Sequence, residues 1–145
     1  MNNIQIENIL TQDKFSKKHF IGVFSRDNLP SKVIIPSTLI FNSDISSGPG
    51  EHWLALNYTK NGNCEFFDSL GLGPHFYGID KYLKDTSKIC KINKNAIQSL
   101  NSSYCGFYSI FFVLVRSRNY SYKTFLNSFG KNTKKNDIYL QKMLN

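Results

Sequence analysis

The chain has 145 residues, of which 41% are hydrophobic and 19% charged, and this length and composition predict one folded domain over residues 1–145. The N-terminus lacks the basic start and apolar core of a signal peptide, and the longest apolar run is too short to cross a bilayer. A secreted protein, a membrane span and a membrane partner are therefore not expected.

The three cysteines, Cys64, Cys90 and Cys105, are an odd number and show no C-x-x-C spacing. This pattern argues against a disulfide framework and indicates a reducing compartment. The three histidines are equally isolated along the chain, so we expect no metal site and no metal cofactor.

The formal net charge is +8, and the basic residues concentrate in segments 14–18, 81–94 and 131–135. Such clusters can be a solvated surface that repulsion keeps soluble. They can equally be an electrostatic footprint for non-specific DNA, because no base-reading motif accompanies them. Charge alone leaves both interpretations open.

The first forty residues mix helical and extended signals. Apolar spacing predicts a short helix over residues 4–11. Branched and aromatic residues predict extended structure in three later segments, residues 20–24, 33–36 and 37–42.

A β-hairpin is predicted in the middle of the chain. Residues 53–58 form its first strand, residues 60–63 its turn, and residues 64–68 its second strand. Antiparallel strands align opposite ends, so His52 before the first strand should lie close to Asp68 at the end of the second.

The second half contains most of the predicted helices. These cover residues 75–84, about 103–117, 121–129 and a last one from Asn132 or Thr133 to Leu144, with a strand over residues 87–92. The helix after residue 103 is apolar nearly all round and should be buried. The predicted fold class is α+β, a mainly antiparallel sheet packed on a central buried helix with Cys105 at its N-terminus.

Cys105 is the candidate nucleophile. At the first turn of a helix, unpaired N–H groups and the positive end of the dipole stabilise a thiolate. Gly106 follows it and leaves space for a substrate carbonyl. The plainer interpretation is a packed thiol, because free cysteines are among the most buried residues.

His52 and Asp68 are the candidate base and its orienting acid. Gln98 would donate a side-chain N–H to an oxyanion beside the Cys105 amide. Trp53 and the loop ending at Gly50 would wall a narrow groove. Each of these residues also has a plainer interpretation. His52 can be a histidine at a strand end without a role, Asp68 a turn aspartate, Gln98 a surface residue and Trp53 part of the core.

The ordered set of these residues resembles a known family. His52-Trp53, Asp68, Gln98 and Cys105-Gly106 resemble the adenovirus protease (adenain) type of cysteine peptidase, whose wider group includes the SUMO-processing proteases. The resemblance covers most of the chain, including segments 20–22, 48–53 and 101–106. It implies the adenain-like cysteine proteinase fold and a Cys-His-Asp triad with a Gln oxyanion hole.

The resemblance also implies a function. We expect a cysteine endopeptidase that cleaves viral structural precursor proteins during capsid maturation, after Gly or another small residue. Two alternatives remain: a protease that removes SUMO- or ubiquitin-like modifiers, and a non-catalytic DNA- or capsid-binding module with the same fold. A viral enzyme of this kind would be a monomer in the virion and in the host cytoplasm, viral factory or nucleus.

The chain departs from the adenoviral pattern in two ways. It has Asp68 where the adenoviral enzyme has Glu, and it is shorter at the C-terminal end. The adenoviral enzyme is activated by DNA and by a peptide attached through a cysteine before the Gln. Cys90 lies in a similar place at a different spacing, so we expect an inert thiol there, while activation by a peptide or by DNA stays open.

Overall fold

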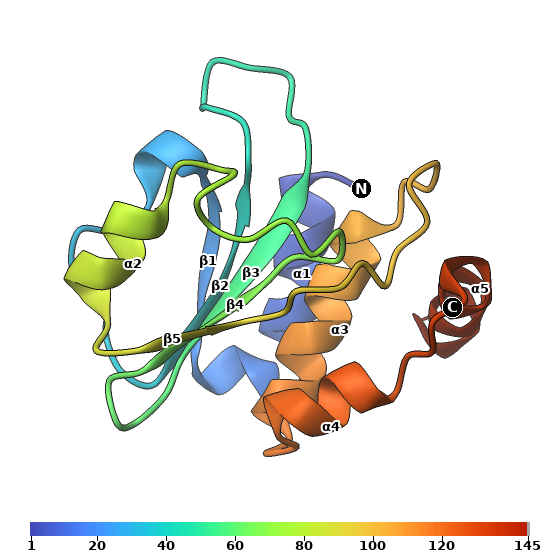
Figure 1. The fold of residues 1–145 in the computed structure, drawn as a ribbon. Helices are drawn as coiled ribbons and strands as arrows, with labels where there is room; N and C mark the ends of the chain where they lie inside the picture. The colour runs from blue at the N-terminus through green and yellow to red at the C-terminus, as the bar shows by residue number, and fades with distance from the viewer. Residues whose placement is uncertain (145) are drawn as a thin grey trace.

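A five-stranded sheet in the order β1-β2-β3-β4-β5 runs through the computed structural model, which describes residues 1–144 (Figure 1). The strands are β1 (Phe20–Ser25), β2 (Ser37–Asn42), β3 (Trp53–Tyr58), β4 (Cys64–Phe67) and β5 (Cys90–Ile92). The helices are α1 (Asn3–Gln12), α2 (Asp80–Thr86), α3 (Cys105–Ser117), α4 (Tyr122–Asn127) and α5 (Thr133–Leu144), with short 3₁₀ turns η1 (Ser16–Lys18) and η2 (Arg26–Asn28).

The sheet is mixed, not mainly antiparallel as predicted. The pairs β2–β3 and β3–β4 are antiparallel, but β1–β2 and β4–β5 are parallel. A parallel pair needs a connection long enough to bring the chain back to the same end of the sheet. Residues 26–36 and 68–89 provide these connections, the second with α2. The sequence therefore predicted the α+β class and missed the direction of both outer strands.

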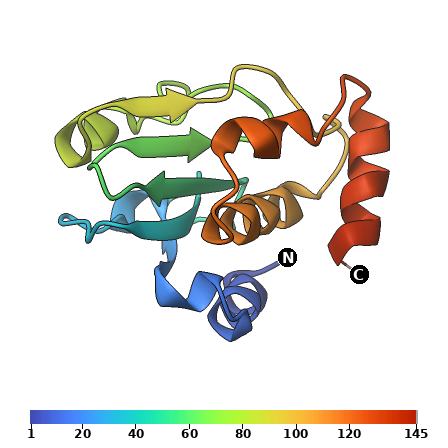
Figure 2. The same cartoon turned by 90° about the horizontal axis from the view of Figure 1, so that it is seen from below.

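Both faces of the sheet are covered, because side chains alternate along each strand. Ile40, Ala55 and Phe67 face a core shared with α1, α3, α4 and α5. Leu39 and Phe41 face a second core that includes α2. Seen from below, α1 and α3 lie against one side of the sheet and α5 stands at the far end (Figure 2).

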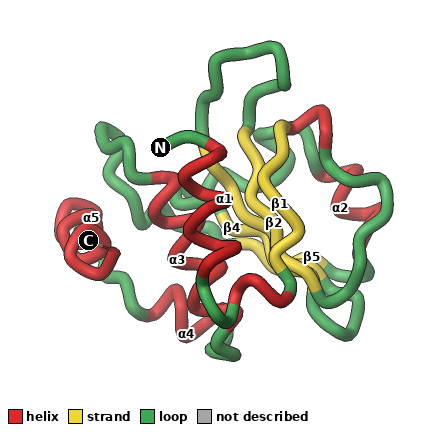
Figure 3. The backbone as a smooth tube through the Cα atoms, turned by 180° about the vertical axis from the view of Figure 1, so that it is seen from behind, coloured by secondary structure: helices red, strands yellow, loops and turns green. Residues whose placement is uncertain are grey.

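Helix α3 lies beside α1 across the same face of the sheet (Figure 3). Seven of its thirteen residues are buried, including Ile110, Phe112 and Val113. Among residues 1–144, no side chain caps its N-terminus, so the first N–H groups of the helix are free of a capping bond. By contrast, α1 begins with a capping box between Asn2 and Gln5.

Most predicted elements are present with small shifts in their ends, but one helix was placed wrongly. The helix expected over 75–84 begins only at Asp80, and residues 33–36, expected to be extended, are not part of a strand. Residues 74–78 form turns, because Gly78 takes a φ of +72° that continues no helix. Within residues 1–144, no helix has the length and apolar character needed to span a membrane.

Candidate active site

The β3–β4 hairpin brings His52 and Asp68 together, as the sequence predicted. Ala55 pairs with Phe67, so the residues just before β3 and just after β4 lie at one end of the sheet. There His52 Nε2 lies 2.7 Å from Asp68 Oδ1. Two residues that are sixteen positions apart in the sequence are thus joined by a hydrogen bond.

Asp68 is fully buried and accepts four hydrogen bonds. Its donors are His52 Nε2 at 2.7 Å, the Tyr77 hydroxyl at 2.6 Å, and the backbone N–H groups of Leu70 and Leu72, each at 2.9 Å. Burial alone would raise the pKa of the carboxyl, but these bonds outweigh it and hold the pKa below its usual range. Asp68 is therefore an ionised, fixed acceptor.

His52 lies between this carboxylate and Cys105. Burial opposes its protonation, but the hydrogen bond to Asp68 and the neighbouring Cys105 sulfur together raise the pKa of His52 to about 9. The Tyr77 ring stacks on the imidazole, with centroids 6.0 Å apart and planes 17° from parallel. Because Nε2 is held by Asp68, Nδ1 is the nitrogen left for the sulfur.

Cys105 is the first residue of α3 and is half-buried. Burial would raise the pKa of its thiol, but His52 and the backbone N–H groups of Trp53 and Gly106 lower it overall. A lowered thiol pKa beside a raised imidazole pKa is typical of a thiolate–imidazolium pair, the reactive form of a cysteine nucleophile.

Gln98 reaches the same site from the segment between β5 and α3. Only 3% of its surface is exposed, and both ends of its amide are bonded. Its Oε1 accepts from the Ser69 hydroxyl at 2.5 Å, and its Nε2 donates to the Ser102 carbonyl at 2.9 Å. One Nε2–H therefore remains for a further acceptor.

A cleft of about 950 Å³ joins these groups. Cys105, His52 and Gln98 line it, together with Trp53 and Gly50, two of the predicted substrate-binding residues. Asp68 lies buried behind His52, as an orienting acid should.

Gly106, the third predicted substrate-binding residue, does not line the cleft. It is buried, and a Cβ there would lie 3.1 Å from Trp53 Cδ1 and 3.4 Å from the Met1 side chain. Gly106 thus lets Trp53 approach α3 closely and does not leave open space for a substrate carbonyl.

The loop joining β2 to β3 rises above the sheet and forms the rim of the cleft (Figure 1). Gly50 in this loop has a φ of +93°, and its N–H donates to Asp44 Oδ2 at 3.0 Å. Trp53 donates its indole N–H to the Met1 carbonyl at 3.0 Å. The rim is therefore tied to the chain on two sides.

Two residues that support the site, Tyr77 and Asn93, were not predicted from the sequence. Asn93 is buried, and its side chain bonds both the N–H and the C=O of Asp68, at 3.0 and 2.5 Å. The turn signals Gly73-Pro74 and Gly78 around Tyr77 could have argued against a helix there. Nothing in the sequence marks Asn93, because its role depends on the pairing of β4 with β5.

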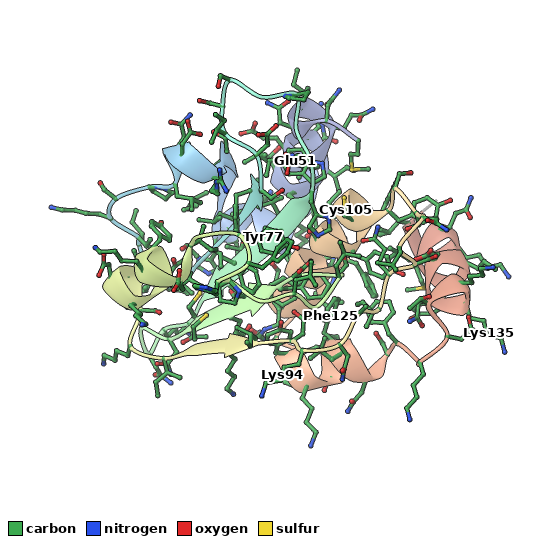
Figure 4. All side chains as sticks on the ribbon, turned by 45° about the horizontal axis from the view of Figure 1, so that its top comes forward. Glu51, Tyr77, Lys94, Cys105, Phe125 and Lys135 are labelled. Atoms are coloured by element: carbon green, nitrogen blue, oxygen red, sulfur yellow. The ribbon has the colours of Figure 1, made fainter. Side chains whose placement is uncertain are left out.

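The excess positive charge lies outside the cleft. Lys94 and Lys135 point away from the molecule, while Cys105 and Tyr77 lie close together near its centre (Figure 4). No Lys or Arg is among the described residues that line the cleft, and Glu51 is its one carboxylate.

The fold and the grouped Cys, His and Asp define a candidate active site of the cysteine-hydrolase kind. No family model matches the chain. The chain is 31% identical over 100 residues to a cysteine protease of African swine fever virus, covering 61% of this chain and 37% of the relative. It is 36% identical over 98 residues to the Acanthamoeba polyphaga mimivirus protein named "Putative thiol protease R355", covering 61% and 32%.

A solved structure shows the same fold over a longer stretch. The crystal structure of the African swine fever virus protease superposes with a TM-score of 0.59 at 19% identity, covering 94% of this chain and 63% of that one. The two sequence comparisons confirm the expected similarity to viral cysteine proteases, and the solved structure adds the likeness of fold. The chain spans about a third of the length of the sequence relatives it matches, so their whole-protein activities are carried to it only as proposals.

Proposed function

We propose that residues 1–145 form a single cysteine peptidase domain that cleaves peptide bonds through Cys105, His52 and Asp68. The observation that carries the proposal is the bond of 2.7 Å between His52 Nε2 and Asp68 Oδ1 beside a thiol of lowered pKa, all at one cleft. Each pKa shift favours the charge state that the role needs: a lowered pKa for the acid and the thiol, and a raised pKa for the imidazole.

Each step of the reaction then has a named group. Cys105 Sγ attacks the scissile carbonyl carbon, and the oxyanion receives hydrogen bonds from Gln98 Nε2 and the Cys105 amide. The C–N bond breaks as His52 gives its proton to the leaving amine, which leaves a thioester. Water then gives a proton to His52 and adds to the thioester carbonyl. The C–S bond breaks, releasing the acid product and restoring the thiolate.

Viral structural precursor proteins are the proposed substrates, with Gly or another small residue before the scissile bond. The relationship to viral cysteine proteases supports the viral context. The close approach of Trp53 to Gly106 supports a narrow passage beside Cys105, because a ring held there restricts the space for a substrate side chain.

The test is co-expression with candidate capsid precursors, with the fragment ends determined by mass spectrometry. We expect cleavage by the native chain and none by Cys105→Ala. Cys90→Ala is the matched control, because Cys90 is a half-buried cysteine on β5 outside the cleft lining, and its loss should leave cleavage intact. Equal cleavage by native chain and Cys105→Ala would refute the nucleophile.

The second candidate is a protease for SUMO-like modifiers. Some African swine fever virus relatives, 30% identical over 100 residues, carry the name SUMO-1 cysteine protease. Comparing the rate on a SUMO fusion with the rate on a precursor protein separates the two activities. The non-catalytic alternative, a DNA- or capsid-binding module, predicts no cleavage of either substrate. The His52–Asp68 hydrogen bond beside a Cys105 thiol of lowered pKa argues against it.

The remaining proposals concern the conditions of activity. We propose a monomer that needs no cofactor for its chemistry and works in the reducing interior of the host cell and in the virion. DNA bound to the basic surface could stimulate the rate, and this effect should weaken as salt rises. Cys90 is the position where an activating peptide would attach by analogy, but its thiol is half-buried and lies in register with Cys64 on the neighbouring strand. We therefore expect no covalent attachment there.

A further inference from the structure

Ser69 connects the acid side of the candidate site to the oxyanion side. It follows Asp68 directly and is 1% exposed. Its hydroxyl donates to Gln98 Oε1 at 2.5 Å. Its carbonyl accepts the backbone N–H groups of Ile97 and Gln98, at 2.9 and 3.1 Å. Side chain and main chain of Ser69 thus both hold the Gln98 segment.

The orientation of the Gln98 amide decides whether it helps or hinders the reaction. The two ends of a carboxamide have nearly the same shape, but Nε2 donates hydrogen bonds and Oε1 only accepts them. An oxyanion is stabilised by a donor aimed at it and repelled by a carbonyl oxygen. An amide free to flip or swing would spend part of its time with the wrong end, or neither end, near the reacting carbonyl.

Two partners fix the amide. The Ser102 carbonyl can only accept, so the end that faces it must be Nε2. The Ser69 hydroxyl donates to the opposite end, Oε1. With both bonds made, the second Nε2–H is the donor left free. The sequence alone does not mark Ser69, because a serine after an aspartate in a turn needs no further role.

We propose that Ser69 is a positioning residue that orients the Gln98 amide for oxyanion stabilisation. The proposal rests on the peptidase function proposed above. In this role Ser69 acts only through Gln98, leaving the Cys105–His52 pair and substrate binding in the ground state unchanged. Losing it should therefore lower kcat and leave KM nearly unchanged, because the oxyanion exists only after the carbonyl is attacked.

The test is a double-mutant cycle on the full chain with a cleavable peptide substrate. Gln98→Ala should lower kcat about a hundredfold, the usual cost of one oxyanion donor. Ser69→Ala should lower kcat about tenfold, the usual effect of one lost buried hydrogen bond, with KM changed less than about twofold. In the Gln98→Ala background, Ser69→Ala should cost less than about twofold, because its target is gone.

Alkylation of Cys105 by iodoacetamide provides a readout independent of the oxyanion. Its rate should be the same in Ser69→Ala as in the native chain, because the thiolate remains paired with His52. Three results would each overturn the proposal: native kcat in Ser69→Ala, a tenfold cost that persists in the Gln98→Ala background, or an alkylation rate that falls with kcat. Activity retained by Cys105→Ala would instead refute the peptidase assignment, so the two failures are distinguishable.

Discussion

Replacing Tyr77 by Phe tests whether the buried carboxylate of Asp68 depends on donors that the sequence did not reveal. The substitution removes the hydroxyl that lies 2.6 Å from Asp68 Oδ2 and keeps the ring that stacks on His52. Three donors to Asp68 remain: His52 Nε2 and the backbone N–H groups of Leu70 and Leu72. The perturbation is therefore one charge-assisted bond out of four.

The expected magnitude follows from that count. A hydrogen bond to a charged group contributes about 1.5 to 3 kcal/mol to stability. Part of this loss is offset, because the variant no longer has to bury a polar hydroxyl on folding. We expect a net loss of about 1 to 2 kcal/mol in the free energy of unfolding. For a chain of this size that corresponds to roughly 3 to 8 °C in Tm. Because the His52–Asp68 bond survives, kcat/KM should fall less than about tenfold.

The pH dependence of this loss has a definite sign. The folded-state pKa of Asp68 lies below the unfolded value, so its contribution is present above the unfolded pKa and is lost as pH falls through the folded pKa. Removing the Tyr77 donor moves the folded pKa up toward the unfolded value. Tyr77→Phe should thus unfold at a higher pH than the native chain during acid titration.

Calorimetry and far-UV circular dichroism between pH 2 and 8 measure both effects. The matched control is Tyr82→Phe. Tyr82 lies on α2, outside the cleft lining, and its hydroxyl donates to the Pro30 carbonyl at 2.6 Å. This control variant should lower Tm without changing kcat/KM or the acid midpoint. Tyr77→Phe with native Tm and native acid midpoint would refute the reasoning, as would a loss of activity equal to that of Asp68→Ala.

Three further predictions follow from the same contacts. First, kcat/KM should fall at high pH as His52 loses its proton near 9. Asp68→Asn should move this fall to lower pH, because the neutral amide no longer stabilises the imidazolium, and an unchanged pH profile would contradict the His52–Asp68 pairing. Second, Gly106→Ala should lower activity as the Trp53 ring yields to the new Cβ at 3.1 Å, and native activity would show that the ring position is unimportant. The change in Tm should be small, because the helix-favouring effect of Ala, about 1 kcal/mol, opposes the cost of this contact. Third, Asn93→Ala should lower stability by about 1 to 3 kcal/mol in denaturant titration, because it leaves the buried N–H of Asp68 without its partner. The Asp68 C=O keeps its bond to the Gly71 N–H, and a loss under about 1 kcal/mol would mean that another group replaces Asn93.

The hairpin was predictable because its signals are local. A turn at residues 60–63 between two apolar runs fixes an antiparallel pair, and the pairing places His52 beside Asp68 whatever the rest of the chain does. The start of α3 at Cys105 was similarly readable, since residues 101–103 are small and polar and the apolar run follows. These two local elements bring the three side chains of the candidate triad to one place.

The outer strands and the supporting residues were not predictable in the same way. Strand direction in β1 and β5 depends on how long connections return across the sheet, and no local pattern encodes it. Tyr77 was placed in a helix because Phe76, Ile79 and Leu83 have helical spacing, yet Gly78 breaks that helix and turns Tyr77 toward Asp68. Asn93 acquires its partners only after β5 has paired with β4.

The consecutive placement of Asp68 and Ser69 limits how the chain can change in length. One side chain orients the histidine and the next contacts Gln98, so inserting or deleting a single residue at this point would exchange or misplace both at once. No substitution elsewhere could restore the two contacts together. The loop over residues 43–50 does not place two consecutive side chains of the candidate site in this way. We therefore expect natural length variation among chains of this fold to occur in that loop and not between residues 68 and 69.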